Sequence, residues 1–155
     1  MTGRIERLRR EYEIELRWVA FPLRPDTPEE GITIEKLFSD RGVNPVRIQT
    51  HLEQVAGEEG LPFGKREKTY NSRRAQELGK WAESMAMEAQ FHDAVFRACL
   101  VEGRNISKIS VLVDLAKSLG LPLNEAETVL ETRAFKSAVD RDWMRSQAMR
   151  IRIVP

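Results

Sequence analysis

The sequence predicts a mainly α-helical protein with one flanking helix and one strand near its N-terminus. Three observations predict this. Apolar residues recur at helical spacing over most of the chain, capping residues and glycines separate these stretches, and only one short stretch alternates in polarity. We expect three parts: residues 1–32 with a helix and the strand, residues 33–149 as a helical domain, and residues 150–155 as the start of another strand.

The N-terminal part changes its period at about residue 13. Ile5, Leu8 and Tyr12 share one face of a helix, with basic and acidic residues elsewhere. Residues 14, 16, 18 and 20 then alternate with their neighbours, which is typical of a strand over residues 13–21. The proline-rich loop FPLRPDTPEEG ends this strand, because proline cannot donate a ladder hydrogen bond.

Start and stop signals divide the helical domain. Helix starts are expected at Thr33, Asn44, Asn71 and Asn124, and helix ends at Gly103 and Gly120. Asn44 is followed by Pro45 in the first turn, and Asn124 has a glutamate three residues on, a variant of the capping box. The last helix carries an apolar stripe of Phe135, Ala138, Val139 and Trp143.

Composition excludes several classes of protein. The 25 basic and 24 acidic residues leave a net charge of +1, which argues against a nucleic-acid partner or a polybasic membrane anchor. No apolar run approaches the ~20 residues of a membrane span. The basic N-terminus has no apolar stretch behind it, so it does not read as a secretory signal. A cytoplasmic protein without a membrane partner is the expectation.

The residues that could carry chemistry are few. Cys99 is the single cysteine, and it shares an apolar stripe with Val95, so we interpret it as a buried core residue. His51 and His92 have no ligand partners at a repeating spacing, so we predict no metal and no cofactor. The tryptophans lie on apolar stripes and are expected in the core, at positions Trp18, Trp81 and Trp143.

The order of these elements is that of a thioredoxin fold with a helical insertion. Four segments match in order: WVAFPLRPDTPEEG, then EEGLPFG with YNSRRAQELGKWA, then FHDAVFRACLVEGRNIS, and finally LVDLAKSLGL. The chain closes with Val-Pro. Over nearly its whole length it resembles the DsbA-like thiol–disulfide oxidoreductases of the FrnE type.

This resemblance implies an active site that the sequence does not complete. In the family a strand ending in Cys-x-x-Cys precedes the first helix, whereas this helix begins at Met1 without a thiol. A strand pair and a final helix follow the family's cis-proline, to which Val154 and Pro155 correspond. We therefore expect a family member trimmed at both ends, with no catalytic residue and no redox activity alone. Protein dithiols and disulfides are the substrates that the resemblance implies.

Three alternatives stay open. One is a kappa-class glutathione transferase or 2-hydroxychromene-2-carboxylate isomerase, in which the basic cluster at residues 4–10 could recognise glutathione, although FPLRPDTPEEG favours the FrnE type. Another is a non-catalytic helical interaction module. The third is a helix-turn-helix that starts at residue 112 and has residues 124–132 as its second helix. It is opposed because that helix carries Glu125, Glu127 and Glu131, so no nucleic acid is expected.

The predicted strand raises a question of its own. A lone strand is not stable, since even an isolated two-stranded hairpin is marginal. The chain offers one good strand and one short start of another. We therefore expect residues 13–21 to find a strand outside their own chain, for example in a homodimer.

Overall fold

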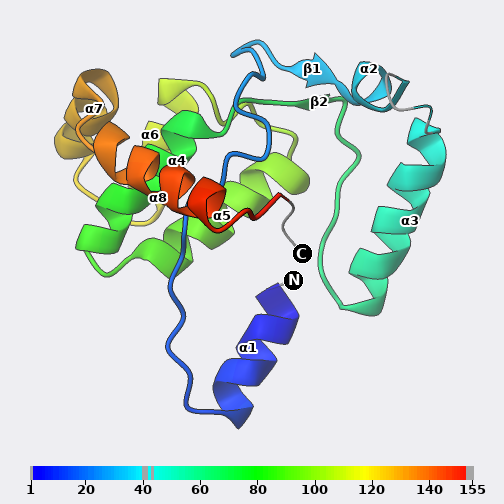
Figure 1. Ribbon diagram of the computed structural model, residues 1–155, viewed down its shortest axis with the longest axis horizontal. Coiled ribbons are helices and arrows are strands. Elements are labelled where there is room, and N and C mark those ends of the chain that lie inside the picture. The colour runs from blue at the N-terminus through cyan, green and yellow to red at the C-terminus, as the bar shows by residue number, and fades with distance from the viewer. Residues whose placement is uncertain (1, 40–41, 43, 153–155) are drawn as a thin grey trace.

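The computed structural model describes residues 2–39, 42 and 44–152, in which eight helices and two very short strands follow one another (Figure 1). This confirms the mainly α class. The elements are α1 Thr2–Glu11, β1 Ile32–Thr33, α2 Ile34–Ser39, α3 Pro45–Glu58, β2 Lys68–Thr69, α4 Arg73–Ser84, α5 Glu88–Leu100, α6 Ile109–Ser118, α7 Leu123–Thr132 and α8 Lys136–Ala148.

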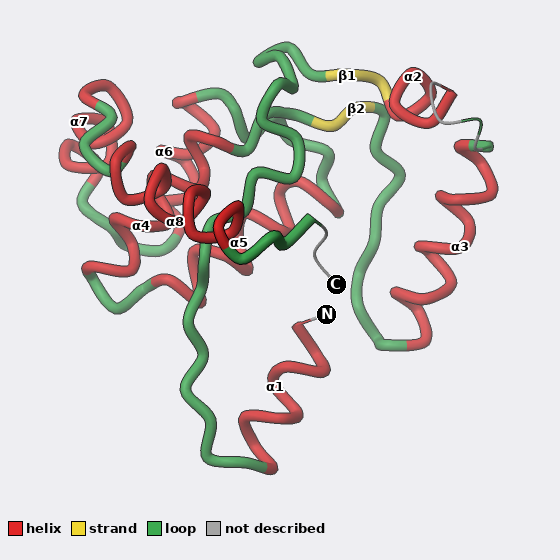
Figure 2. Tube along the Cα trace, viewed as in Figure 1, coloured by secondary structure: helices red, strands yellow, loops and turns green. Residues whose placement is uncertain are grey.

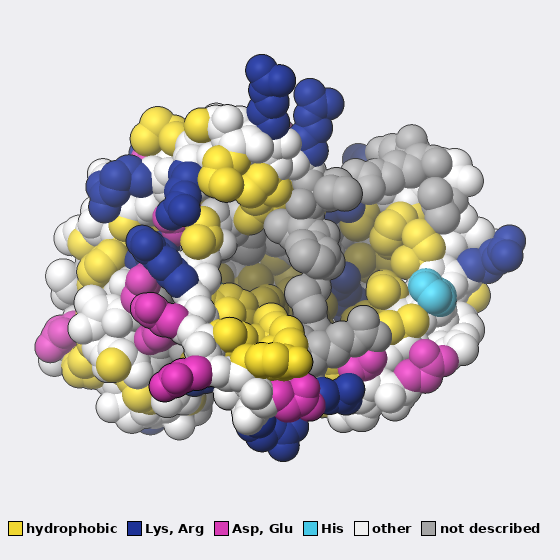
Figure 3. Space-filling model, turned by 60° about the horizontal axis from the view of Figure 1, so that its bottom comes forward, with side chains coloured by type: hydrophobic (Ala, Val, Ile, Leu, Met, Phe, Trp, Pro, Cys, Tyr) yellow, Lys and Arg dark blue, Asp and Glu magenta, His cyan; other side chains and the backbone are white. Residues whose placement is uncertain are grey.

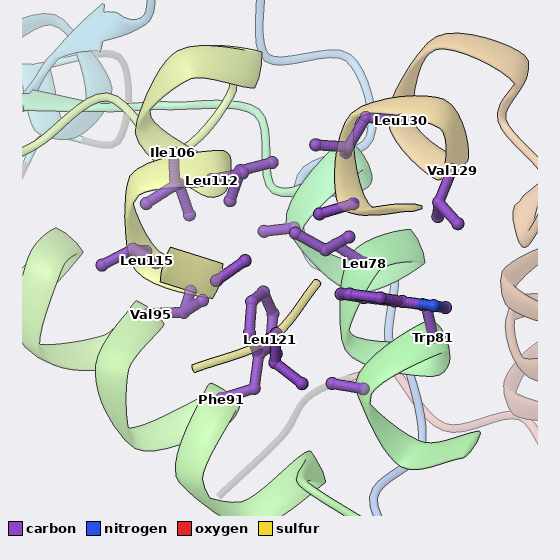
Figure 4. Packing of buried hydrophobic residues seen from close by; sticks show 14 of the residues in the cluster. Leu78, Trp81, Phe91, Val95, Ile106, Leu112, Leu115, Leu121, Val129 and Leu130 are labelled. Carbon is purple, nitrogen blue, oxygen red and sulfur yellow. The ribbon is translucent and has the colours of Figure 1, made fainter. Parts of the chain in front are cut away.

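The hydrophobic core lies among helices α4 to α7, with α8 packed against α4 (Figures 1 and 4). Its largest apolar members each come from a different helix and are fully buried: Leu78, Phe91, Leu112 and Leu130. Burying a side chain of this kind contributes roughly 1.5–3 kcal/mol. The apolar stripes predicted from the sequence therefore face one another in a single core.

Several of the predicted helix signals are confirmed. The Asn44 side chain accepts hydrogen bonds from the backbone N–H groups of Val46 and Arg47, at 2.9 and 3.3 Å. Thr33 Oγ1 accepts from the Lys36 N–H at 3.2 Å. Gly103 and Gly120 follow helices with φ of 66° and 72°, a left-handed conformation that glycine adopts without a steric cost.

Two predicted starts are displaced. Asn124 is not a cap, because α7 already begins at Leu123 and Pro122 occupies the N-cap position with φ of −62°. The proline ring fixes φ near this value, but its side chain cannot accept a hydrogen bond, so no side chain caps this helix start. Asn71 acts one residue before the N-cap of α4, where its side chain accepts from the Arg73 N–H at 2.8 Å.

The strand predicted over residues 13–21 is not part of a sheet within the described residues. The segment is extended, and its side chains alternate as predicted, with Leu16, Trp18 and Ala20 less exposed than their neighbours. It appears as loop in Figure 2 because no strand among the described residues is hydrogen-bonded to it. The two-stranded sheet is instead β1 with β2, antiparallel with Ile32 opposite Thr69. Strands of two residues are too short to give an alternating pattern.

Helices α2 and α3 lie away from the main body, beyond the β1–β2 pair (Figure 1). Helix α3 contains no buried residue, whereas each of α4 to α8 contains at least two. The boundaries at residues 32 and 149 therefore stay a prediction. Along the described chain, no helix combines the length and apolarity that a membrane span needs.

A buried ionic network joins α4 to the end of α7. Glu77 is 1% exposed and accepts hydrogen bonds from Arg73 and Arg133, each at 2.6 Å. Burial alone would raise the pKa of Glu77, but the hydrogen bonds and charges of Arg133 and Arg73 outweigh it and lower the pKa. Arg73 also pairs with Asp140 at 2.6 Å, and its guanidinium lies 4.4 Å from the ring centre of Trp143.

Candidate functional site

The site residues assigned by resemblance, Val154 and Pro155, lie outside the described residues, as does Met1. Figure 1 draws α1 below the helical body, joined to it by the extended segment. In the part of the chain that the structure describes, no three histidine, cysteine or acidic side chains come close enough to hold a metal ion. The candidate functional features among the described residues are therefore Cys99 and the surfaces of α1, α5 and the extended segment.

Cys99 lies near the end of α5, more than two helical turns after its start, and is half-buried against the hydrophobic core. This is less complete burial than the sequence analysis predicted. Its Sγ lies 4.0 Å from the guanidinium of Arg66. Burial raises the pKa of the Cys99 thiol, and the nearby Arg66 offsets this only in part. The thiol form, which is a poor nucleophile, is therefore favoured.

A groove of about 550 Å³ runs beside the extended segment, between α1 and the start of α5. Its apolar lining comes from Ile14, Leu16 and Trp18. Charged side chains of both signs surround these residues: Arg9, Glu13, Glu15 and Glu88. Figure 3, which turns the underside of Figure 1 forward, shows hydrophobic side chains gathered around the hollow in the middle of this face.

An aromatic stack holds the extended segment against α5. The rings of Trp18 and His92 stack with centroids 4.3 Å apart, and Phe96 lies 6.2 Å from each of them. Burial, with the charge of Lys80, lowers the pKa of His92 and outweighs Glu88 and Glu83. His92 is thus a neutral packing residue at pH 7.

Lys80 and Asp142 form hydrogen bonds with the backbone of the same segment. Lys80 Nζ donates to the Trp18 carbonyl at 3.3 Å and pairs with Asp142 at 2.9 Å. Asp142 accepts from the Ala20 N–H at 2.9 Å. Sequence reasoning missed these contacts because the partners lie more than 60 positions apart. The alternating pattern of residues 14–20 was the one sequence signal that could have pointed to these contacts, because it marks the residues that the helices contact.

A comparison with family models decides the wider relationship. The model of the DSBA-like thioredoxin domain matches residues 1–155, which is the whole chain. The chain belongs to this family. The resemblance stated from the sequence is therefore confirmed at the level of the DsbA-like family.

Solved structures show the same fold. The DSBA-like chain superposes on the crystal structure of a probable DsbA oxidoreductase from Streptomyces coelicolor with a TM-score of 0.88 and 22% identity, covering 99% of this chain and 71% of that one. It also superposes on a 2-hydroxychromene-2-carboxylate isomerase with a TM-score of 0.75 and 20% identity, covering 99% and 74%. Among curated proteins no significant match was found.

The three tryptophans of this DSBA-like chain differ in burial. Trp81 is in the core at 5% exposed, as predicted, whereas Trp18 and Trp143 are half-buried at the edges of the helical body. Trp143 donates from its indole nitrogen to Gln76 at 2.8 Å.

Glu125, Glu127 and Glu131 are exposed on α7, where their charges would repel a nucleic acid. The absence of a nucleic-acid partner stays a prediction.

Proposed function

We propose that this DSBA-like chain is of the FrnE type, that complete members of this type act on protein dithiols and disulfides in the cytoplasm, and that Cys99 does not perform the exchange. Membership of the family and the fold of a DsbA oxidoreductase support the class of reaction. The segment FPLRPDTPEEG supports the FrnE type.

This proline-rich segment has a defined place in the structure. Asn71 donates from its side-chain amide to the carbonyls of Pro25 and Thr27, at 3.1 and 2.7 Å. Ser107 and Asn105 donate to the Glu29 carbonyl at 2.7 and 3.0 Å. The loop is thus fixed to the helical body by side chains of the segment YNSRR and of the turn before α6. Both segments are among those on which the resemblance to the FrnE type rests.

The proposal that Cys99 does not perform the exchange rests on its position and on the lack of a second thiol. Thiol–disulfide exchange needs an attacking thiolate and a second thiol that resolves the mixed disulfide. Cys99 is the single cysteine of the 155 residues, so a resolving thiol within this chain does not exist. The raised pKa of Cys99 reduces its thiolate fraction as well. This chain alone is therefore not an exchange catalyst.

Reduction of insulin by dithiothreitol, followed as turbidity, tests this proposal. We expect the purified chain to leave the rate equal to that of the buffer, and Cys99→Ser to behave in the same way. A family oxidoreductase with an intact Cys-x-x-Cys serves as the positive control. A rate above the buffer that Cys99→Ser abolishes would show that Cys99 exchanges after all.

A second candidate function is glutathione binding. The fold is also that of a 2-hydroxychromene-2-carboxylate isomerase. Arg7, Arg9 and Arg10 are exposed on α1, and Arg9 lines the groove. A guanidinium there could pair with a carboxylate of glutathione. Calorimetric titration with glutathione tests this: binding that is lost in Arg9→Gln and kept in Arg47→Gln, on the surface of α3, would favour this function over the first.

A further inference from the structure

A small pocket lies where the proline-rich loop, residues 21–31, meets the start of α4 and the end of α7. It has a volume of about 150 Å³, and the described residues that line it are all polar or charged: Glu29, Asn71, Arg73, Arg74, Ser107 and Arg133. Sites for drug-sized organic molecules are larger, at roughly 300–1,000 Å³, and mostly apolar. The ligand that suits this pocket is therefore small and polar.

Arg74 uses only part of its hydrogen-bonding capacity. Its Nη1 donates to the Glu29 carboxylate at 2.6 Å and to the Ser107 carbonyl at 3.3 Å. Its Nε is closed off from solvent and has no acceptor among the described residues. Buried donors are nearly always hydrogen-bonded, so an unmatched donor on a charged guanidinium indicates that this side chain can take a further acceptor.

The ionic network around the pocket has an excess of positive charge. Within the described residues, its ion pairs join four basic and three acidic side chains: Arg73, Arg74, Arg133 and Lys136 with Glu29, Glu77 and Asp140. This leaves one net positive charge. Arg133 donates to Glu77 from Nε and Nη2, and its side chain is 40% exposed, so its outer side faces solvent. An anion that enters the pocket is therefore attracted and not repelled.

Glu29 shows what kind of group the pocket attracts. Its carboxylate reaches Arg74 from 45 positions away in the chain, although its side chain is 68% exposed. The hydrogen bond with Glu77 raises the pKa of Arg133, and the charge of Glu29 adds to this effect. An exposed ion pair is weak, because water and salt compete with it. Glu29 can therefore be replaced by an anion that reaches both Arg74 and Arg133.

We propose that this pocket binds a phosphate group, which displaces the Glu29 carboxylate and pairs with Arg74 and Arg133. A phosphate offers more acceptor oxygens and more charge than a carboxylate, and guanidinium groups bind it through paired hydrogen bonds. Arg73 keeps its buried pair with Glu77 and holds the site in place. Cys99 does not line this pocket, so the proposal is independent of thiol chemistry.

Calorimetric titration of the chain with inorganic phosphate, at neutral pH and constant ionic strength, tests the proposal. We expect saturable binding to the wild-type chain. Arg74→Gln should weaken it by at least about tenfold, because charge-assisted hydrogen bonds are lost. Glu29→Gln should instead tighten binding, because it removes the competing carboxylate. A general loss of structure would weaken binding in both variants, so the opposite directions are diagnostic.

A second ion pair provides matched controls. Arg104 and Asp114 are 31% and 66% exposed, close to the 28% and 68% of Arg74 and Glu29, and they do not line the pocket. Arg104→Gln and Asp114→Asn should therefore bind phosphate like the wild type. Circular dichroism of each variant establishes that the helical body is folded.

Two further probes identify the source of the phosphate group. Binding of glycerol 3-phosphate as well would assign the site to the end of a phosphomonoester, whereas binding of inorganic phosphate alone would assign it to the free ion; either result supports the proposal. Sodium acetate should bind at least about tenfold more weakly. The proposal is overturned if phosphate does not bind or acetate binds equally well. It is also overturned if Arg74→Gln binds like the wild type, or if Glu29→Gln fails to bind more tightly.

Discussion

The imidazole of His92 stacks on the indole of Trp18 with centroids 4.3 Å apart and ring planes inclined by 26°. This contact joins helix α5 to a segment more than 70 residues earlier in the chain. It places a histidine of lowered pKa beneath the strand-like segment, next to Lys80. The packing of the segment should therefore respond to pH.

We predict that acidification weakens the folded state through His92. Its folded pKa is lower than its ordinary value near 6.5, so the unfolded chain binds the proton more readily. The contribution of His92 to the free energy of unfolding is therefore fully present above about pH 6.5, and it is lost as the pH falls toward the folded pKa. Urea unfolding should therefore give a lower free energy of unfolding at pH 5.5 than at pH 7.5.

The second histidine provides the control. His51 is exposed on α3, so His51→Gln should keep the pH dependence of the wild type. His92→Gln should remove that part of the dependence, although its stability at pH 7.5 falls because the stack is lost. An unchanged slope in His92→Gln would contradict the assignment of the effect to His92.

We predict that Glu77→Ala destabilises the protein by about 3 kcal/mol, because it leaves Arg73 and Arg133 without their buried partner. Glu131→Ala, at an exposed position of α7, should change stability by no more than about 0.5 kcal/mol. Chemical denaturation of both variants measures the difference. Equal effects would mean that the network stabilises nothing.

We predict opposite effects of alanine at two glycines. A Cβ at Gly64 would overlap the Val101 carbonyl, so Gly64→Ala should cost about 2 kcal/mol by displacing the loop from α5. Gly57 lies inside α3 with open space around it, so Gly57→Ala should stabilise by about 0.5–1 kcal/mol. Thermal unfolding of the two variants gives the signs. If Gly64→Ala unfolds at the same temperature as the wild type, the backbone of Gly64 does not lie this close to the Val101 carbonyl.

The helices could be predicted from the sequence because their signals are local. Asn44 with Pro45 and the glycines at 103 and 120 act within a few residues, and each works as expected. The network of Glu77 with Arg133 could not be predicted, because the two are 56 positions apart and only the helix packing brings them together. Arg73 and Glu77, four apart, gave the one local sign of it.

The candidate site divides in the same manner. That Cys99 lies on an apolar stripe follows from spacing, but its contact with Arg66, which comes from a loop, could not be predicted. The strand character of residues 13–21 could be read from their period, whereas their contacts with Lys80, His92 and Asp142 could not. A pattern shows which side of a segment is covered, and tertiary packing decides what covers it.

The reactivity of Cys99 tests the central claim, that the one thiol of this DSBA-like chain is a packing residue and not an exchange thiol. The rate of its reaction with an aromatic disulfide is measured in the native chain and in urea-unfolded chain at the same pH. We predict at least about a tenfold slower reaction in the native state, because burial hinders access and raises the pKa of the thiol. Equal rates, or a faster native reaction, would contradict it.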